Sequence, residues 1–570
     1  MNAGPENVSV GCIVKIRGTD VPEQQAGMRS GGEILVSALR IHGLDTVFGV
    51  PGESSLPFFD ALLKPDAGVR FIQCRHEANA SHMAEADAKL RGLPGVCIVS
   101  RGPGAMHAAI GLHTARQDST PMLLIVGQVP TAERGREGFQ EVDYTRMFAD
   151  MTKWVAEVNS ADKLPEYVSR ALHVATHGRP GPVVLCVPED VLEETSDVTD
   201  FPAYKPVLSS PSDADMARLA DLVGKARRPL VIVGGSGWTQ EASAQVTRFC
   251  ISNNLPVVAG FRSQDIFDNR LDQYIGDLSL GSSSALTERV KNADLLLVIG
   301  DRLSEITTKA YTALNVPVPD QTLIHVFPGP EDLGSVYNPH LPILANVTRF
   351  AEALENVAPL ESEAWSDWTR EGRAAYEAYQ ETPAKAVGIN IANIIKHLSA
   401  TLPEDAIVTN GAGNYNIWLH RFFRYKTFGT QIAPKSGSMG YGLPAAIASK
   451  LRKPERAVVA LAGDGCFMMA SPDFATAVQN NLGIVVIIVN NSTYGSIRMH
   501  QERHFPGRPS GTALCNPDFA MLAQTYGVLG TVVEQEDQFP AALEQALASG
   551  GPAIIELRVS ERQLTPDMII

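Results

Sequence analysis

Short runs of Val, Ile and Leu alternate along the chain with longer, Ala-rich segments whose apolar positions recur at helical spacing. The apolar runs end in turns that contain Gly or Pro, as in 46–52 (TVFGVPG) and 457–465 (AVVALAGDG). Continuous apolar strands that alternate with amphipathic helices are typical of parallel sheets buried on both faces. The pattern therefore predicts an α/β fold built from doubly wound parallel sheets.

The predicted strands fall into three blocks along the chain. The first block holds 46–52, 95–104 and 121–130, the second 229–237, 293–301 and 322–329, and the third 405–413, 457–465, 483–491 and 552–559. In doubly wound sheets, ligands bind beyond the carboxyl ends of the strands. Glycines cluster at those ends here, so we expect the functional sites there.

Two segments of different composition separate the three blocks. One is a linker rich in Pro, Ser and Asp, and the other is a charged, helical connector with an extended end. A chain of 570 residues is also too long for one hydrophobic core. The predicted division is an N-terminal extension at 1–27, domains at 28–197, 216–359 and 386–570, a linker at 198–215 and a connector at 360–385.

Composition excludes several classes of partner and compartment. The net charge of −15 offers no basic footprint for nucleic acid or for a membrane surface. Seven scattered cysteines, with no CxxC pair, argue against a disulfide framework and a zinc site. Apolar runs such as 484–489 are too short to cross a bilayer. Residues 1–27 lack the features of a secretion signal, so we expect a mobile extension without assigned function and a cytoplasmic protein.

An acid and an amide follow two consecutive strands of the third block. Asp464 stands between Gly463 and Gly465, and Asn491 is the second residue of an Asn pair 27 positions later. If the strands are neighbours, both side-chain oxygens reach one crevice and suit a hard cation such as Mg²⁺. A helix beginning within 467–478 would direct free N–H groups at an anion. The pattern thus predicts Mg²⁺ that holds a diphosphate.

This GDG…NN arrangement resembles the signature of the thiamine diphosphate (ThDP) enzymes. In that family the acid, the second Asn and a backbone carbonyl two residues later hold Mg²⁺, which implies Asp464, Asn491 and Thr493 as the metal ligands here. A bulky apolar residue bends ThDP into its reactive shape, which implies Met439. The other cofactor-binding residues implied by the resemblance are Gly52, Asn414, Tyr415, Gly437, Gly463, Gly465, Tyr494 and Gly495.

A second motif supports the same family. Glu77 stands immediately before an Ala-rich helix, and a GPG turn follows at 102–104. The family requires one carboxyl group beside the aminopyrimidine ring, where a shared proton favours the imino tautomer. That imine removes the thiazolium proton to give the ylide nucleophile. The resemblance implies that Glu77 has this role, and that it reaches ThDP held by the Asp464 domain of another chain.

Within the family the chain is most similar, from about residue 29 onward, to the acetolactate (acetohydroxyacid) synthases. The similar segments include 49–62 (GVPGESSLPFFDAL) and 435–448 (KSGSMGYGLPAAIA). Further active-site residues implied by this similarity are Phe139, Gln140, Lys153, and Arg302, which would hold the carboxylate of a second substrate. The implied reaction is decarboxylation of a 2-keto acid such as pyruvate and ligation of the two-carbon unit to a second keto acid or aldehyde. A homodimer or homotetramer is also implied.

Several positions depart from the acetolactate synthases. His500 stands where those enzymes have a tryptophan that favours 2-ketobutyrate, which leaves the acceptor open; it is either a proton donor near the carbanion or a solvent-facing helix residue. In the middle block, Phe327 and Gly329 replace acids that meet the adenosine part of FAD in flavin-binding relatives. A Rossmann-like GGSG turn remains at 234–237 but is a weak signal by itself. FAD is therefore a less favoured cofactor than ThDP and Mg²⁺.

Other functions stay open. One is a decarboxylase without ligation, which needs a proton donor for the carbanion; His76, His107 and His500 are candidates. Another is a carboligase with a different donor substrate, or a flavin-dependent oxidase. A nucleotide-binding or regulatory protein that kept only the fold is a fourth, but the retention of Glu77 and Asp464 argues against it.

Overall fold

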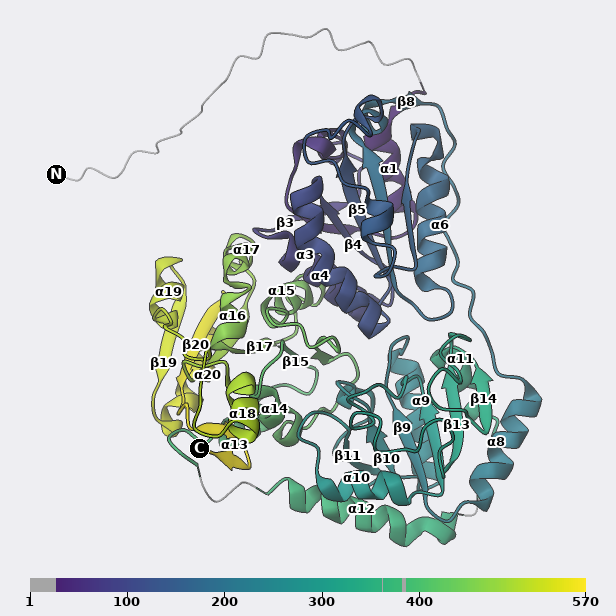
Figure 1. Cartoon of the computed structure of the whole chain (residues 1–570), viewed down its shortest axis with the longest axis vertical. Coiled ribbons are helices and arrows are strands. Elements are labelled where there is room, and N and C mark those ends of the chain that lie inside the picture. The colour runs from purple at the N-terminus through teal and green to yellow at the C-terminus, as the bar shows by residue number, and fades with distance from the viewer. Residues whose placement is uncertain (1–26, 361, 382–385) are drawn as a thin grey trace, which may run out of the picture.

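The computed structural model describes residues 27–360, 362–381 and 386–570. Three sheets of six parallel strands, each covered by helices, occupy three separate parts of the molecule (Figure 1). This arrangement confirms the predicted fold class. Of the N-terminal extension predicted at 1–27, residues 1–26 lie outside the described residues.

The first sheet has the strand order β3-β2-β4-β5-β7-β6. Its strands are β2 (Thr46–Gly49), β3 (Arg70–Gln73), β4 (Gly95–Val99), β5 (Met122–Gln128), β6 (Trp154–Glu157) and β7 (Pro182–Pro188). Two helices, α1 (Gly31–Ile41) and α6 (Leu164–Thr176), share a core with one face of this sheet. The other face packs against α3 (Glu77–Arg91) and α4 (Gly102–Asp118).

The second sheet has the order β11-β10-β9-β12-β13-β14. Its strands are β9 (Pro229–Val233), β10 (Val257–Ala259), β11 (Tyr274–Asp277), β12 (Leu295–Ile299), β13 (Thr322–Phe327) and β14 (Leu341–Leu344). Its helices are α8 (Asp213–Lys225), α9 (Gln240–Ser252), α10 (Ser284–Asn292) and α11 (Val347–Leu354). The connector helix α12 (Ser366–Tyr379) runs along the lower edge of the molecule toward the third sheet (Figure 1).

The third sheet has the order β16-β15-β17-β18-β20-β19. Its strands are β15 (Ile407–Asn410), β16 (Gln431–Ile432), β17 (Val458–Gly463), β18 (Ile484–Asn490), β19 (Leu529–Val533) and β20 (Ala553–Arg558). Helix α15 (Gly442–Arg452) packs against α3, so that one hydrophobic cluster runs through the first and third units. Arg452 also bridges Asp45 and Asp87 across that contact, at 3.0 and 2.8 Å.

All the predicted strands are present. The GPG segment at 102–104, expected to be a turn, is instead the start of helix α4 (Gly102–Asp118). Two boundaries differ from the prediction. The helix after GDG is α16 (Asp464–Met468), which begins at the acid itself instead of within 467–478. The linker ends three residues early, because Ser212 caps α8 and residues 213–215 are helical. Helix α12 lies within the connector predicted at 360–385, of which positions 361 and 382–385 fall outside the described residues.

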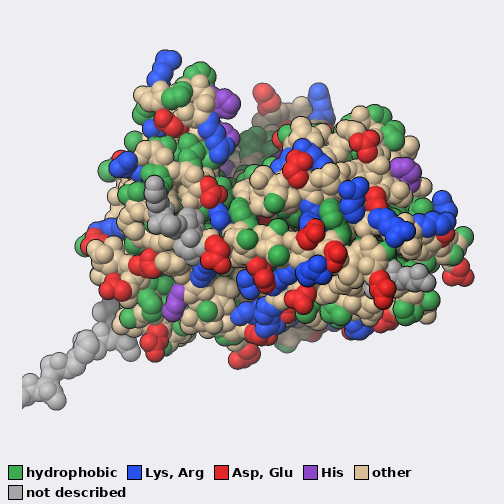
Figure 2. Space-filling model, turned by 90° about the horizontal axis from the view of Figure 1, so that it is seen from below, with side chains coloured by type: hydrophobic (Ala, Val, Ile, Leu, Met, Phe, Trp, Pro, Cys, Tyr) green, Lys and Arg blue, Asp and Glu red, His purple; other side chains and the backbone are tan. Residues whose placement is uncertain are grey.

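No helix in the described part of the chain is long and apolar enough to cross a membrane. On the face seen from below, basic and acidic side chains are interspersed (Figure 2). On α12, for example, Arg370 pairs with Asp367 at 2.8 Å and Arg373 with Glu377 at 3.0 Å. This face therefore carries paired charges without a broad basic patch.

Candidate active site

Asp464 and Asn491 lie at one edge of the third sheet. Strands β17 and β18 are parallel neighbours, with Gly463 opposite Val489. Each of the two side chains follows its strand directly, so both reach the crevice beyond the carboxyl ends. Asp464 is only 3% exposed.

A cavity of about 230 Å³ opens above these residues. It collects most of the residues that the family resemblance implies for the cofactor and the metal. These are Asn414, Tyr415, Gly437, Met439, Gly463, Asp464, Gly465, Asn491, Thr493, Tyr494 and Gly495. Gly52 and Glu77 are not among the residues that line it.

The Asp464 carboxylate is held by a residue that the sequence did not single out. Asn516 donates through Nδ2 to Asp464 Oδ2 at 2.7 Å and to Asn490 Oδ1 at 3.0 Å. Asn490 in turn donates to Glu556 Oε1 at 2.8 Å. Burial raises the pKa of Asp464 above its ordinary value, and hydrogen bonds from the Gly465 amide and Asn516 partly oppose this.

The two glycines that flank Asp464 make room for aromatic rings. A Cβ on Gly465 would lie 2.6 Å from the Tyr494 ring, and a Cβ on Gly463 would lie 3.1 Å from the Tyr415 ring. The tyrosines therefore pack directly against the backbone on both sides of the acid. This is a physical reason for the GDG spacing.

The oxygen donors at this edge fit a hard cation. Asp464 offers a carboxylate, Asn491 an amide oxygen that accepts from the Thr493 amide at 3.2 Å, and Thr493 a backbone carbonyl. Thr493 is fixed by a hydrogen bond from its hydroxyl to the Thr512 carbonyl at 3.0 Å. Carboxylate, amide and carbonyl oxygens are the ligands that Mg²⁺ prefers in proteins. The residues present therefore fit a Mg²⁺-diphosphate group.

A larger hollow of about 870 Å³ adjoins this cavity. Both are lined by Gly413, Asn414 and Gly437. His500, on α18 (Gly495–His504), is exposed and lines the hollow together with Met499. The structure thus places His500 beside the cofactor cavity and open to solvent.

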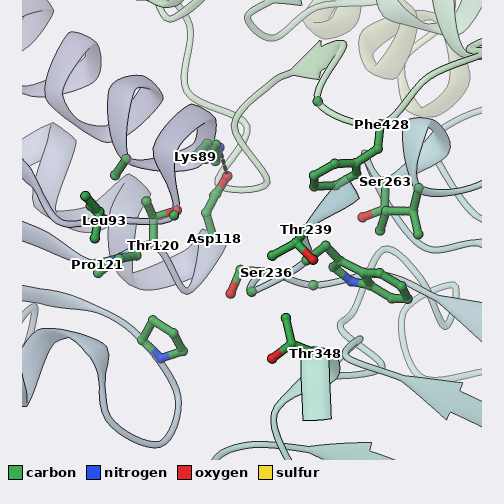
Figure 3. A pocket seen from close by; sticks show the side chains of 18 of the residues that line it. Lys89, Leu93, Asp118, Thr120, Pro121, Ser236, Thr239, Ser263, Thr348 and Phe428 are labelled. Carbon is green, nitrogen blue, oxygen red and sulfur yellow. Dashed lines mark hydrogen bonds and ion pairs between the residues drawn. The ribbon is translucent and has the colours of Figure 1, made fainter. Parts of the chain in front are cut away.

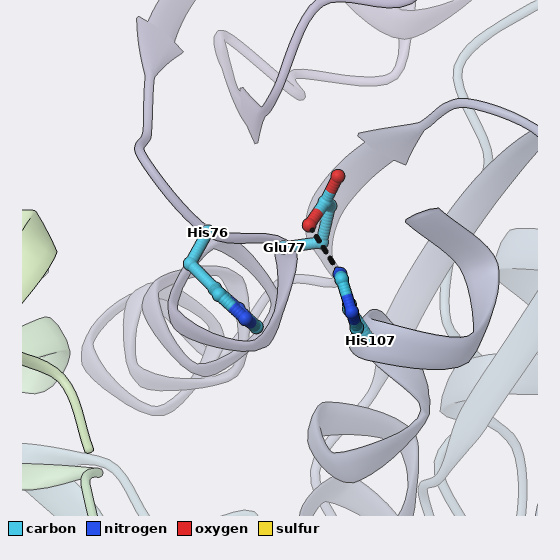
Figure 4. Close-up of side chains that lie close together, drawn as sticks. All are labelled: His76, Glu77 and His107. Carbon is cyan, nitrogen blue, oxygen red and sulfur yellow. Dashed lines mark hydrogen bonds and ion pairs between the residues drawn. The ribbon is translucent and has the colours of Figure 1, made fainter. Parts of the chain in front are cut away.

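Glu77 is the first residue of α3, on the first sheet (Figure 4). Its side chain is 16% exposed, and its Oε2 atom lies 2.9 Å from Nδ1 of His107 on α4. Gly52 lies at the same edge, since a Cβ there would come within 2.5 Å of the Ser100 side chain. The neighbouring His107 is a contact that the sequence did not indicate.

Phe139 and Gln140 lie in the loop that follows β5, and this loop contacts the start of α4. The Gln140 carbonyl accepts from the Gly102 amide at 3.1 Å, and Gln140 has a φ of 65°. The Phe139 side chain is 73% exposed.

Lys153 and Arg302 lie at the junction of the first and second units. Lys153 donates to the carbonyls of His177 and Arg179 at 2.5 and 2.8 Å, and Arg302 donates to the Gln117 carbonyl at 3.1 Å. Burial and the nearby Arg302 lower the pKa of Arg179 to about 10. Neither Lys153 nor Arg302 lines the cofactor cavity or the outer hollow.

A further cavity of about 310 Å³ lies where the three units meet, over the GGSG turn (Figure 3). Trp238 and Phe428 form part of its largely apolar wall. At the strand ends, the Asp301 carboxylate lies against Gly234, where an added Cβ would be 2.3 Å away.

Fold and site together define a protein of three parallel-sheet units with a cavity at the edge of the third, whose oxygen donors fit a hard cation. Family models match each unit. "Thiamine pyrophosphate enzyme, N-terminal TPP binding domain" matches residues 29–147, the "central domain" model matches 216–354, and the "C-terminal TPP binding domain" model matches 411–557. The chain belongs to the thiamine pyrophosphate (ThDP) enzymes.

Relatives are similar over almost the whole chain. The acetolactate synthase isozyme 2 large subunit of Escherichia coli (strain K12) is 31% identical over 93% of this chain and 96% of its own length. The acetolactate synthase catalytic subunit, mitochondrial, of Saccharomyces cerevisiae is 30% identical over 94% of this chain and 81% of its own. The probable acetolactate synthase large subunit of Methanocaldococcus jannaschii is also 30% identical, over 94% and 93%. This chain is thus an enzyme related to acetolactate synthases.

Proposed function

We propose that the protein uses ThDP and Mg²⁺ to decarboxylate a 2-keto acid, pyruvate first among them, and ligates the two-carbon unit to a second keto acid or aldehyde. The observation that carries this proposal is the single cavity that gathers Asp464, Asn491 and Thr493 with the Met439 and Asn414 segments. The relatives' names support the ligating reaction.

The residues of the cavity, and Glu77 outside it, each have a separate task in this proposal. Asp464, Asn491 and the Thr493 carbonyl hold Mg²⁺, and Asn414 and Tyr415 border the place of the diphosphate. Met439 supports the bend of the cofactor, and Glu77 holds a proton at the ring nitrogen. When bound, ThDP supplies the electron sink that allows CO₂ to leave.

His500 is the residue of the outer hollow that meets the acceptor in this proposal. Its exposed imidazole stands beside the cavity entrance. Phe139, Gln140, Lys153 and Arg302 stay predictions from the family resemblance, because they lie away from the cavity of their own chain. If His500 instead donated a proton to the two-carbon unit, the protein would be a decarboxylase without ligation, which is the second candidate function.

We also propose that the active unit is at least a homodimer, with a homotetramer as the larger assembly. Glu77 does not line the cavity of its own chain. Large apolar side chains are exposed on α4 beside Glu77 and on α16 beside Asp464. They are Met106 (56%), Ile110 (41%), Met468 (42%) and Met469 (52%). Burial of these surfaces by a second copy would bring Glu77 of one chain to the cavity of the other.

Mixing two inactive variants tests the shared site. Glu77→Gln and Asp464→Ala homodimers each lack one half of every site. Random exchange of subunits would give mixed dimers with one intact site, and about a quarter of wild-type activity in total. Activity that stays at the level of the unmixed variants would exclude a site shared between chains.

The function itself is tested by incubating the purified protein with pyruvate, ThDP and Mg²⁺ and identifying the products by mass spectrometry. Acetolactate is the expected product, and omission of ThDP or Mg²⁺ should abolish it. Acetaldehyde alone would establish the decarboxylase instead. A yellow protein with flavin absorbance would overturn the preference against FAD, and cell fractionation would test the cytoplasmic location that we predict.

A further inference from the structure

Glu77 and His107 form a close pair that neither the motif nor the relatives' names assign. They come from the starts of two adjacent helices, and 30 positions separate them in the chain. Glu77 is half-buried, whereas the His107 side chain is 53% exposed (Figure 4). Nδ1 of His107 lies 2.9 Å from Oε2 of Glu77.

The hydrogen-bond partners of His107 and His76 indicate which ring nitrogen of each histidine carries the proton. A carboxylate only accepts, so His107 donates through Nδ1–H. Nδ1 of the adjacent His76 accepts from the Ala78 amide at 3.1 Å, so the neutral His76 ring carries its proton on Nε2.

The same assignment decides against a metal at this place. The ligand atoms of His76, Glu77 and His107 lie within 4.8 Å of one another. A metal bound at Nε2 of His76 would require the loss of the Nδ1 contact that caps α3. The cluster is better explained as a hydrogen-bonded support for the carboxylate.

We propose that His107 is a positioning residue for Glu77, an inference that rests on the function proposed above. By holding Oε2, His107 leaves Oε1 as the oxygen that shares a proton with the cofactor ring. Oε1 lies over Gly104, where an added Cβ would be 3.4 Å away. A Glu side chain that is free to rotate would lose this orientation, because fixing its rotamer costs conformational entropy.

His76 completes the support from the other side. Its ring lies 4.6 Å from that of His107, centre to centre, at an angle of 31°. This contact limits rotation of the His107 imidazole, so the direction of Nδ1–H is set by packing as well as by the hydrogen bond.

The pair can be tested in the cofactor-free protein through acylation of histidines by diethyl pyrocarbonate, mapped by mass spectrometry. At a pH well above the histidine range every imidazole is neutral, so the rate reports nucleophilicity. An adjacent carboxylate increases that nucleophilicity. His107 should therefore react several-fold more slowly in Glu77→Gln than in the wild type. His113, exposed on the same helix, is the internal control and should not change.

Turnover of the ThDP- and Mg²⁺-loaded enzyme tests the consequence. His107→Leu removes the donor and should lower kcat by about 10- to 100-fold with little change in KM, the loss expected for a hydrogen bond to a charged group. His107→Asn keeps an N–H donor near the Nδ1 position and should recover most of that loss. Circular dichroism of each variant checks that the fold is retained.

The outcomes separate this inference from the function on which it rests. Equal acylation of His107 in wild type and Glu77→Gln would overturn the pair. Unchanged kcat in His107→Leu, or equal losses in His107→Leu and His107→Asn, would overturn the positioning role. A wild-type enzyme without 2-keto acid turnover would refute the proposed function, while the acylation rates would still decide whether the pair exists.

Discussion

The cofactor cavity and the Glu77 corner differ in how completely one chain builds them. The cavity lies within the third unit, and its acid is 3% exposed and held by Asn516. The corner lies at the edge of the first unit, where His107 and Phe139 are exposed by 53% and 73%. One region is enclosed by its own chain, and the other has an open side.

This difference suggests that the cavity binds the cofactor and that the Glu77 corner serves proton transfer. Binding of a charged cofactor needs preorganised, buried donors, which a single sheet edge can supply. In the function proposed above, proton transfer to the cofactor depends on Glu77, which does not line the cavity of its own chain. The open Glu77 corner is therefore the part that we expect assembly to complete.

The largest expected effect is on turnover, and it would sharpen the comparison. Glu77→Gln should retain ThDP binding but lose about 10²- to 10⁴-fold in kcat, the range for removal of a general acid-base group. Steady-state kinetics with pyruvate and a fluorescence titration with ThDP measure the two quantities separately. Undiminished kcat would remove Glu77 from the mechanism.

Asp464→Ala changes the cofactor cavity, and its main expected effect is on cofactor binding. Loss of a direct metal ligand should weaken Mg²⁺-dependent ThDP binding by more than about 100-fold, because even indirect supports of a metal cost 10- to 100-fold. Isothermal titration calorimetry measures this. Asp537→Ala is the control, since Asp537 is exposed in the same unit, outside the cavity. Equal affinities in the two variants would contradict the metal role.

The sequence predicted the inner strands of the sheets better than the outer ones. β17 and β18 are continuous apolar runs because both of their faces are buried. Two inner strands, β7 (Pro182–Pro188) and β10 (Val257–Ala259), were missed. None of the outer strands β3, β6, β11, β14, β16 and β19 was identified. They are short or half-exposed, as β3 (Arg70–Gln73) shows with only Ile72 buried, so they lack a clear apolar period.

The residues of the candidate site also fall into a group that the sequence predicted and a group that it did not. The GDG and NN motifs place their residues locally, and the structure brings them to one cavity. Contacts between distant segments could not be inferred, since they depend on how the units pack. Asn516 lies 52 positions from Asp464, and Asp473 lies 398 positions from the Arg75 amide that it binds.

Asp473, a residue of the third unit, holds the segment around Glu77 in the same chain, and its replacement should have a smaller effect. It is fully buried and accepts from the Arg75 amide at 2.8 Å and from Asn79 Nδ2 at 2.6 Å, on both sides of Glu77. Asp473→Asn places a donor against these donors, so the start of α3 should loosen and kcat should fall about 10-fold.

The control for this variant is Asp518→Asn, which alters another helix cap in the third unit without a link to α3. Hydrogen exchange of the 75–80 peptide should increase in Asp473→Asn alone. A fall in kcat without faster exchange there would mean that Asp473 acts on turnover by some route other than the Glu77 segment.

The smallest expected effect concerns stability in the absence of cofactor. The folded-state pKa of Asp464 lies above its unfolded value of 3.8, so ionisation of this buried carboxyl destabilises the fold. The cost is absent below pH 3.8, grows as the pH rises from 3.8 toward the folded-state pKa, and is constant above that pKa. Asp464→Asn should therefore raise the apparent Tm of the cofactor-free protein by about 2 °C at neutral pH and leave it unchanged in acid.

Scanning calorimetry with EDTA measures the difference, and Mg²⁺ with ThDP should reverse its sign by stabilising only the wild type. A lower Tm for Asp464→Asn at neutral pH would mean that the empty cavity already stabilises its carboxylate, and that the burial in this region carries no cost for the metal to offset.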